Sequence, residues 1–392
     1  MNILLTDGNN RAALAITRSL GRAGYTVFCG EKTEDSISSA SKYCHGKFTY
    51  ADPVRHSDKF VEDVLQQVEI QKIDLVIPVS EITTLLITEN SEMFQGKCKL
   101  AFSDYFNIAN ASNKAHVFDL AAKLDVPIPR THTLNSILDL ETLDPAFPYP
   151  VVIKPSRSRV KTKSGWLLTR VSYAYDSEEL RKSLEDKPEE EYPVLLQQRI
   201  NGPGIGVFAC YADGQLMAIF SHRRLREKPP SGGVSVLRES TEVNPKAKLY
   251  TDKLLKALKW NGVAMVEFKL DEDDNEPKLM EINARYWGSL QLAIDAGVNF
   301  PLIMTDYQLK QIRNPVPQYR VGIRSRWFWG DFDALLLLLL KPPHKLQLPP
   351  SHPGRLKTLL EFLKLWNKQT HYEVFSWKDI KPWLLETRRK FF

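Results

Sequence analysis

The chain has 392 residues, of which 43% are hydrophobic and 26% charged, the balance of an ordinary folded protein. This length predicts about two to three domains, and this composition excludes a disordered or collagen-like chain. The longest apolar run, residues 334–340, is far shorter than the roughly 18 residues that a membrane-spanning helix needs.

The formal net charge of +6 is concentrated at the C-terminal end. Residues 341–392 carry 11 Lys and Arg against 4 Asp and Glu, whereas residues 1–340 carry 42 against 43. A nucleic-acid-binding protein usually places its positive charge on a folded face with a recognisable reading motif, and the sequence contains none. We therefore expect no nucleic-acid partner.

The four cysteines, Cys29, Cys44, Cys98 and Cys210, are scattered and form no CxxC pattern. This spacing argues against a zinc site or a disulfide framework and indicates a reducing compartment. The first residues lead directly into a strand-like run, without the basic head and apolar core of a secretion signal. We expect a soluble cytoplasmic protein, with an enzyme as the working hypothesis.

The first hundred residues alternate strand and helix patterns. Strand-like runs occur at residues 3–6, 25–29 and 73–79, and residues 12–20 have the spacing of a helix. This alternation predicts a parallel α/β sheet. The first turn contains one glycine, Gly8, where a dinucleotide-binding turn needs three, which argues against a dehydrogenase.

Polar residues follow two of these strands. In an open α/β sheet, ligands bind beyond the carboxyl ends of the strands. Asp7-Gly8-Asn9 and Ser80-Glu81 occupy such positions and are candidates for lining a substrate pocket. Helix capping is the alternative interpretation and the one that we favour.

From about residue 110 the pattern changes. Residues 114–124 predict a helix, and strands are expected at 151–155, 194–200, 206–211 and 216–220. Strands joined by short turns predict an antiparallel sheet, so this part of the chain is of the α+β class. The stretch at 156–165, rich in Ser, Arg and Lys, is predicted to be a mobile loop.

Residues 263–283 contain two alternating strands around an acidic turn. If this hairpin is centred on Asp274, Glu267 lies directly across from Glu281, and Asn283 is the diagonal neighbour of Glu267. Opposed carboxylates repel each other, so a divalent cation such as Mg²⁺ is the natural compensating group. Arg285 follows at the next alternate position, where it is placed to clamp a phosphate. The alternative interpretation is a solvated hairpin with a polar outer face.

Another group of charges lies at residues 221–227. On a strand, His222, Arg224 and Arg226 share one face, and three cationic or potentially cationic groups together need an anion. A transferred phosphate or an acyl phosphate would supply that anion. The alternative is a basic edge strand at the surface.

These residues carry a resemblance to a known family. A Glu267 strand followed by Glu281-x-Asn283-x-Arg285 resembles the C-terminal half of the ATP-grasp superfamily. Residues 221–227, followed by Pro- and Gly-rich residues 229–233, are similar to a stretch in ligases of its carbamoyl-phosphate-synthase-like branch. The resemblance covers roughly residues 1–310, and its separate elements occur in the family's order.

The resemblance implies roles for residues elsewhere in the chain. Lys114 and Lys154 resemble the family's two phosphate-binding lysines, although Lys114 alone would be interpreted as a solvated surface residue. Gln197, Gln198 and Ile200 fall in a segment that resembles the adenine-binding linker, where Gln197 replaces a typical glutamate. By the same resemblance, Glu267, Glu281 and Asn283 would hold the metal, and Arg224, Arg226 and Arg285 would be the catalytic cations.

The predicted architecture is an α/β domain followed by an α+β fold. We expect a parallel α/β domain at residues 1–110, ATP-grasp subdomains at 111–195 and 196–310, and a basic, partly helical C-terminal extension at 311–392. The extension has an apolar stripe at helical spacing, which we expect to pack on the protein itself or on a second subunit, as in a homodimer. Attachment to a membrane surface is the less favoured alternative. The stripe consists of Leu356, Leu359, Leu360, Leu363 and Trp366.

The predicted function is an ATP-dependent ligase that joins a small-molecule carboxylate to an amine, with Mg²⁺ or alternatively Mn²⁺ as the metal. In the family, ATP converts the carboxylate to an acyl phosphate, ADP is released, and an amine then displaces phosphate. Such a reaction needs no covalent nucleophile, and the chain has no GxSxG motif or plausible Cys/His nucleophile pair. The alternatives are a carboxyphosphate-forming carboxylase or carbamoylating enzyme, and an ATP-binding regulatory protein without turnover.

Overall fold

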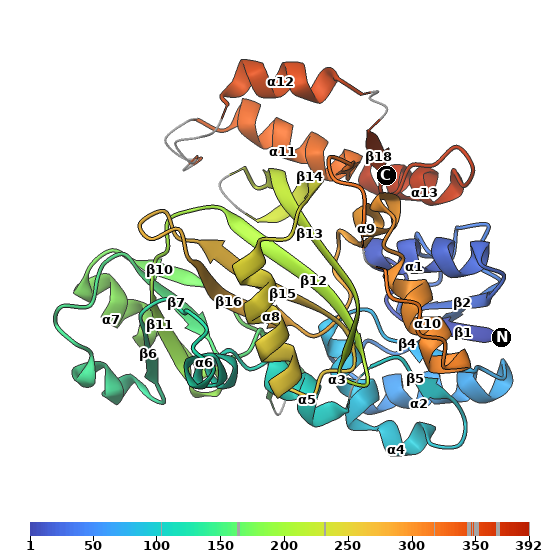
Figure 1. The fold of residues 1–392 in the computed structure, drawn as a ribbon, viewed down its shortest axis with the longest axis horizontal. Coiled ribbons are helices and arrows are strands. Elements are labelled where there is room, and N and C mark those ends of the chain that lie inside the picture. The colour runs from blue at the N-terminus through green and yellow to red at the C-terminus, as the bar shows by residue number, and fades with distance from the viewer. Residues whose placement is uncertain are drawn as a thin grey trace.

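The computed structural model describes residues 1–102, 104–162, 165–230, 233–316, 318–342, 346, 348, 353–365 and 369–391. Within these ranges, no helix combines the length and the apolar character needed to cross a membrane. The described chain forms three sheets with helices packed on them, together with one small separate hairpin (Figure 1).

The N-terminal sheet is parallel, with strand order β3-β2-β1-β4-β5. Its central strands are almost entirely buried, as expected for a parallel sheet with helices on both faces. The prediction of a parallel α/β sheet is therefore confirmed. The elements are β1 (Asn2–Leu5), α1 (Arg11–Arg22), β2 (Thr26–Glu31), β3 (Gly46–Thr49), α2 (Ser57–Ile70), β4 (Leu75–Ile77), α3 (Glu81–Glu89), α4 (Ser91–Phe94) and β5 (Lys99–Leu100).

A second sheet of four strands is antiparallel, with order β10-β7-β11-β6. One face packs against a helix through Ile153, Leu196 and Leu180. Because side chains alternate along a strand, Lys154 and Gln197 lie on the opposite face. The elements are α5 (Tyr105–Ala111), α6 (Lys114–Lys123), β6 (Thr131–Leu134), the 3₁₀ turn η1 (Ile137–Thr142), β7 (Val151–Pro155), β10 (Ser172–Ala174), α7 (Ser177–Glu185), the 3₁₀ turn η2 (Glu189–Glu191) and β11 (Val194–Gln198).

The third sheet is the largest, with order β16-β15-β12-β13-β14-β17-β18. Its pairs are antiparallel except for β17 and β18, so the predicted antiparallel α+β class is confirmed. The elements are β12 (Gly204–Ala212), β13 (Gln215–Lys228), β14 (Val234–Thr241), α8 (Pro245–Ala257), β15 (Gly262–Leu270), β16 (Pro277–Asn283), α9 (Leu290–Ala296), α10 (Phe300–Lys310), β17 (Arg324–Arg326) and β18 (Thr370–Tyr372).

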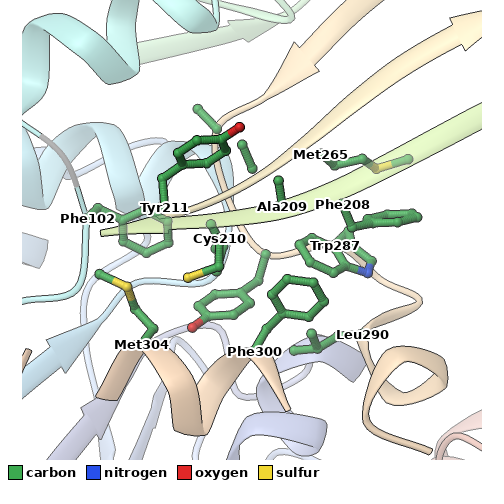
Figure 2. Packing of buried hydrophobic residues seen from close by; sticks show 14 of the residues in the cluster. Phe102, Phe208, Ala209, Cys210, Tyr211, Met265, Trp287, Leu290, Phe300 and Met304 are labelled. Carbon is green, nitrogen blue, oxygen red and sulfur yellow. The ribbon is translucent and has the colours of Figure 1, made fainter. Parts of the chain in front are cut away.

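The N-terminal domain and the large sheet share one hydrophobic core. Figure 2 shows Cys210 of β12 beside Phe300 and Met304 of α10. Phe102, which follows the N-terminal sheet, belongs to the same cluster and packs edge-on against Tyr286. This common core fixes the carboxyl ends of the N-terminal strands beside β16 and the segment that follows it.

The C-terminal extension contains the helices α11 (Phe328–Leu340), α12 (Arg355–Leu363) and α13 (Lys381–Phe391). Strands β17 and β18 extend the large sheet, and α13 returns to the N-terminal domain (Figure 1). Arg18 of α1 anchors this return, because its Nε donates to Asp379 Oδ2 at 2.8 Å and its Nη2 donates to the Val374 carbonyl. The extension thus connects both ends of the fold.

The expectation that the leucine stripe of the extension packs on the protein itself is wrong. Leu356, Leu360 and Leu363 are 71%, 54% and 60% exposed, whereas Thr358 and Phe362 face the interior. The helix is rotated because Phe362 packs against the Arg326 guanidinium, whose carbon lies 4.3 Å from the ring centroid. Trp366 lies outside the described residues.

Candidate active site

The hairpin of β15 and β16 places two carboxylates opposite each other. Glu267 is the register partner of Glu281, and Asn283 lies diagonally across, so the predicted register is confirmed. Asn283 Nδ2 donates to Glu281 Oε1 at 3.0 Å and lies 3.4 Å from Glu267 Oε1. The register slips by one residue directly after this pair, which makes Met280 the extra residue of a β-bulge. Leu279 consequently enters the core in place of Met280.

The two carboxylates have different electrostatic surroundings. Burial, followed by the charge of Glu281, raises the pKa of Glu267, although Arg224 partly opposes this. Burial alone would raise the pKa of Glu281 too, but Lys114, the hydrogen bond from Asn283 and Lys154 together lower it. The pair therefore carries repulsion that a bound cation would relieve.

Asn283 connects this pair to Arg285. Arg285 Nη2 donates to Asn283 Oδ1 at 3.0 Å, and its Nη1 donates to the Tyr286 carbonyl at 3.0 Å. With one side chain accepting from Arg285 and donating to Glu281, the three residues form a continuous row at the end of β16. Such a row presents carboxylate oxygens and a guanidinium to the same side of the strand.

Both predicted lysines reach this row from other elements. Lys114 begins α6, and its Nζ lies 3.4 Å from Glu281 Oε2 and 3.2 Å from Ser158 Oγ. Lys154 projects from β7, where its Nζ is 3.9 Å from Met280 Sδ. Burial lowers the pKa of Lys154 to about 8, against an opposing effect of Glu281. Lys114, which is 9% exposed, is therefore not the solvated surface residue that its sequence neighbourhood alone would indicate.

The proposed adenine segment lies on the same side of the second sheet. Gln197 is 1% exposed; its Nε2 donates to Thr131 Oγ1 at 2.9 Å. Its Oε1 is buried without a hydrogen-bond partner among the described residues. The backbone N–H of Gln198 donates to the Arg130 carbonyl, and the Ile200 carbonyl accepts from Lys269 Nζ at 3.0 Å.

The three residues predicted to share a basic face on β13 are separated by the structure. Arg224 Nη2 donates to Glu267 Oε2 at 3.1 Å, so Arg224 belongs to the cluster. Arg226 does not, because the β13–β14 register shifts on either side of it and both Asp331 oxygens accept from its guanidinium, at 2.7 and 2.6 Å. The bulge thus turns Arg226 towards α11, which corrects the expectation that it is a catalytic cation.

His222 is near the cluster but is not a cation. Its ring stacks on Phe208 with the centroids 4.8 Å apart, and its Nε2 is hydrogen-bonded to Ser289 Oγ at 2.9 Å. Burial, followed by the charges of Arg238 and Arg224, holds the pKa of His222 well below its usual value. The expected set of three cationic groups is therefore reduced to Arg224.

A small hairpin replaces the loop predicted at 156–165. Strands β8 (Arg159–Thr162) and β9 (Gly165–Leu168) pair with each other, and Trp166 Nε1 donates to Ser57 Oγ of α2 at 3.1 Å. Lys163 and Ser164, at its tip, lie outside the described residues, as do Ser231 and Gly232 of the Pro- and Gly-rich stretch. The hairpin bridges to the N-terminal domain, and Ser158 before it contacts Lys114, a contact that no sequence pattern indicated.

The candidate residues that follow strands of the N-terminal domain have two different roles. Asp7 Oδ2 accepts from the Ser80 N–H at 2.9 Å and from Thr83 Oγ1 at 2.6 Å, and Ser80 caps α3, so these residues are structural. Glu81 instead lines the cleft formed with Lys114 and Glu281. Helix capping and cleft lining therefore both occur, at neighbouring positions.

The donor set suits a magnesium nucleotide. The described residues contain no group of three or more His, Cys, Asp and Glu side chains that would enclose a metal. Glu267, Glu281 and Asn283 offer two carboxylates and one amide, which leaves positions for phosphate oxygens and water, the arrangement that Mg²⁺ prefers. The unpartnered Gln197 Oε1 is an acceptor of the kind that an exocyclic amino group would satisfy.

Comparison with known proteins identifies the fold. Residues 190–329 match the model of a family described as ATP-grasp in the biosynthetic pathway with Ter operon. The chain is similar to L-amino acid ligase from Bacillus licheniformis, at 17% identity and a TM-score of 0.61 over 80% of this chain and 74% of that one.

Two further solved structures have the same fold with a nucleotide bound. N5-carboxyaminoimidazole synthetase from Staphylococcus aureus, complexed with ADP, has 14% identity and a TM-score of 0.61 over 82% of this chain and 80% of that one. The biotin carboxylase domain of Hydrogenobacter thermophilus 2-oxoglutarate carboxylase, with MgADP and bicarbonate, has 14% identity and a TM-score of 0.64 over 82% and 73%. The chain therefore has the ATP-grasp fold that its sequence resembled.

Proposed function

We propose that this ATP-grasp protein is an ATP- and Mg²⁺-dependent ligase that activates a carboxylate as an acyl phosphate and joins it to an amine. The observation that carries the proposal is the meeting of Glu267, Glu281, Asn283 and Arg285 with two lysines from other elements. In a simply solvated hairpin, Lys154 would not be buried beside Glu281, because burial disfavours the charged form of the lysine.

Each group has a role in holding the nucleotide. Lys114 and Lys154 would bind phosphate oxygens, and Gln197, with neighbouring Gln198 and Ile200, would adjoin the adenine. Glu267, Glu281 and Asn283 would hold Mg²⁺, or Mn²⁺ in its place. Held by these three residues, the ion would supply positive charge that neutralises part of the charge of the phosphates.

The proposed chemistry proceeds in two displacements. A carboxylate oxygen of the substrate attacks the γ-phosphorus of ATP, the bond to the β–γ bridging oxygen breaks, and ADP leaves. An amine nitrogen then attacks the acyl carbon, phosphate leaves with the bonding electrons, and the nitrogen loses a proton. Arg285 and Arg224, which donate to Asn283 and Glu267, would stabilise the negative charge that develops on the transferred group and so lower the barrier.

The names of the similar proteins describe more than one kind of reaction. One is described as an L-amino acid ligase, whereas others are carboxyaminoimidazole synthetases and biotin carboxylases. We favour the carboxylate–amine reaction, the kind that the name L-amino acid ligase describes. Bicarbonate-dependent ADP release would instead identify the carboxylase alternative.

The test is to screen amino acids and dipeptides for acceptor-dependent ADP release, with hydroxylamine added to trap the acyl phosphate as a hydroxamate. Glu281→Gln should abolish hydroxamate formation, because the metal loses a carboxylate ligand. Glu272→Gln is the matched control, since Glu272 is an exposed residue of the same hairpin turn. AMP as the nucleotide product, or full activity in Glu281→Gln, would refute the proposal.

A further inference from the structure

A second cavity lies where α13 meets the first turn of the N-terminal domain. Its volume is about 400 Å³, within the range of small-molecule sites. The first βα turn, β14, the start of α11 and α13 all contribute to its walls. The lining side chains include Arg11, Ile37, Val234, Trp327, Glu386 and Arg389.

One wall carries an arginine whose charge is incompletely matched. The Arg11 guanidinium stacks on the Trp327 ring at 3.7 Å, and its Nε lies 3.3 Å from Glu373 Oε2. Its Nη1 is buried with no hydrogen-bond partner in the described chain. Burial lowers the pKa of Arg11 to about 10, with the charge of Glu386 opposing that effect. Such a group favours an anion beside it.

The cavity is also lined by an acid, Glu386 of α13, in the complementary condition. Glu386 Oε1 accepts from Trp327 Nε1 at 2.8 Å. Burial raises the pKa of Glu386, although the Trp327 hydrogen bond and Arg11 lower it in part. Arg11 and Glu386 thus line one cavity and influence each other's pKa, and no ion pair joins them among the described residues.

The second arginine of the cavity is already occupied. Arg389 Nη1 donates to Asn9 Oδ1 at 2.5 Å, and its Nη2 donates to the Asp35 carbonyl at 2.6 Å. Arg389 therefore closes the cavity towards the N-terminal domain. Arg11 and Glu386 remain as its two charged groups with incomplete partners.

The cavity adjoins the proposed reaction centre through Arg11. A Cβ added to Gly288 would lie 3.2 Å from Arg11 Nη2, and Gly288 follows Arg285 by three residues. On the sheet side, Arg238 pairs in register with Arg224, and the charge of Arg11 contributes to the lowered pKa of Arg238. A carboxylate bound at Arg11 would therefore lie on the side of the cavity that is nearest to the residues proposed to bind the transferred phosphate.

We propose that this cavity binds the carboxylate substrate and that this substrate is an α-amino acid. Its carboxylate would face Arg11, its ammonium group would pair with Glu386, and its side chain would contact Trp327, Ile37 and Val234. Two opposite charges that line one cavity without an ion pair between them match a zwitterion better than a simple anion or a simple amine. The inference rests on the proposed function and narrows its substrate class.

The test compares each free α-amino acid with the same acid lacking its α-amino group, by calorimetry on the full-length protein in the absence of nucleotide. At least one amino acid should bind, and more tightly than its deaminated analogue. Glu386→Gln keeps an acceptor for Trp327 but removes the charge, so it should weaken amino-acid binding by about tenfold or more and abolish the preference over the analogue. Glu34→Gln, at a side chain that is 85% exposed, is the control and should change neither.

A second variant keeps the inference testable if Glu386→Gln does not fold. Val234 is 55% exposed at the cavity wall, so Val234→Trp should fold and should exclude all but the smallest amino acids. Binding of MgADP should be unchanged in both variants. Absence of amino-acid binding, or amino-acid binding that neither variant alters, would overturn the inference. Unchanged MgADP binding and ADP release with another carboxylate would still support the proposed function, whereas loss of MgADP binding in the parent protein would refute that function itself.

Discussion

Lys154 offers a direct test of how the cleft is built, because its charge costs stability in the absence of nucleotide. Its pKa is lowered from 10.5 to about 8, chiefly by burial. This difference in pKa means that folding destabilises the protonated form of Lys154 by roughly 3 kcal/mol at neutral pH. Lys154→Met, which keeps the length of the side chain next to Met280, should therefore raise the free energy of unfolding by about 1–3 kcal/mol near pH 7.

The pH dependence has a defined sign. Because the folded-state pKa is below the unfolded-state value, the unfolded chain holds the proton more tightly, and the cost is complete below about pH 8. It then decreases as the pH rises from about 8 to 10.5. The stability gained in Lys154→Met should consequently be largest near neutral pH and largely disappear by about pH 10.

Urea unfolding at several pH values measures this gain, and MgADP provides the functional half of the test. A bound phosphate would lose its lysine partner, so MgADP should bind Lys154→Met about tenfold or more weakly and stabilise it less. Lys161→Met is the control, since the Lys161 side chain is 60% exposed and its loss should change stability by no more than about 0.5 kcal/mol. A Lys154→Met protein that is less stable than the parent at neutral pH, or that binds MgADP equally well, would refute the reasoning.

The same geometry predicts opposite outcomes for two neighbouring arginines. Arg224→Gln should lower kcat/KM for ATP by on the order of a hundredfold with little change in stability, whereas Arg226→Gln should leave kcat/KM within a few-fold and cost about 1–3 kcal/mol, because Asp331 loses a bidentate partner. Steady-state ADP release and urea unfolding separate the two, and equal kinetic losses would contradict the placement of Arg226. In the extension, Asp379→Asn should cost about 3–5 kcal/mol in urea unfolding, since it leaves the buried Arg18 without its carboxylate, and a loss below 1 kcal/mol would contradict this.

Local sequence was sufficient to predict the register of the β15–β16 hairpin. Two strands that alternate apolar and polar residues around a short turn have little freedom in register, because a slip by one residue would expose the core face. The opposition of Glu267 and Glu281 follows from that constraint alone. The bulge at Met280 did not follow from the local pattern. Met280 lies next to Lys154, which belongs to the second sheet and to a distant part of the chain.

The errors have the same origin in long-range contacts. Arg226 and Arg224 are equivalent in the local pattern, and only Asp331, 105 residues further along the chain, distinguishes them. His222 has an ordinary titratable side chain in sequence, but Phe208 and Ser289 bury and bond it, so that it remains neutral. In both cases the strand pattern showed which face a residue occupies, but it carried no information about what covers that face.

The positive net charge of the C-terminal extension conceals the contacts that its few acidic residues make. Of the 4 acidic residues in 341–392, three contact arginines outside the extension, and Glu386 contacts Trp327 within it. Glu361 lies 3.8 Å from Arg226, Asp379 pairs with Arg18, and Glu386 accepts from Trp327. Glu373 serves two cations, since it pairs with both Arg11 and the fully buried Arg238.

This arrangement matters because buried arginines are costly without carboxylate partners. The N-terminal domain contributes Arg11 and Arg18, the large sheet contributes Arg238, and neither unit supplies the acids that these residues contact in the extension. The extension therefore supplies the carboxylate partners that these arginines need where the carboxyl ends of the N-terminal strands lie against the large sheet. Because the proposed substrate cavity lies at that same junction, Glu373, which matches the charge of Arg11, also holds Arg11 at the cavity that Glu386 lines.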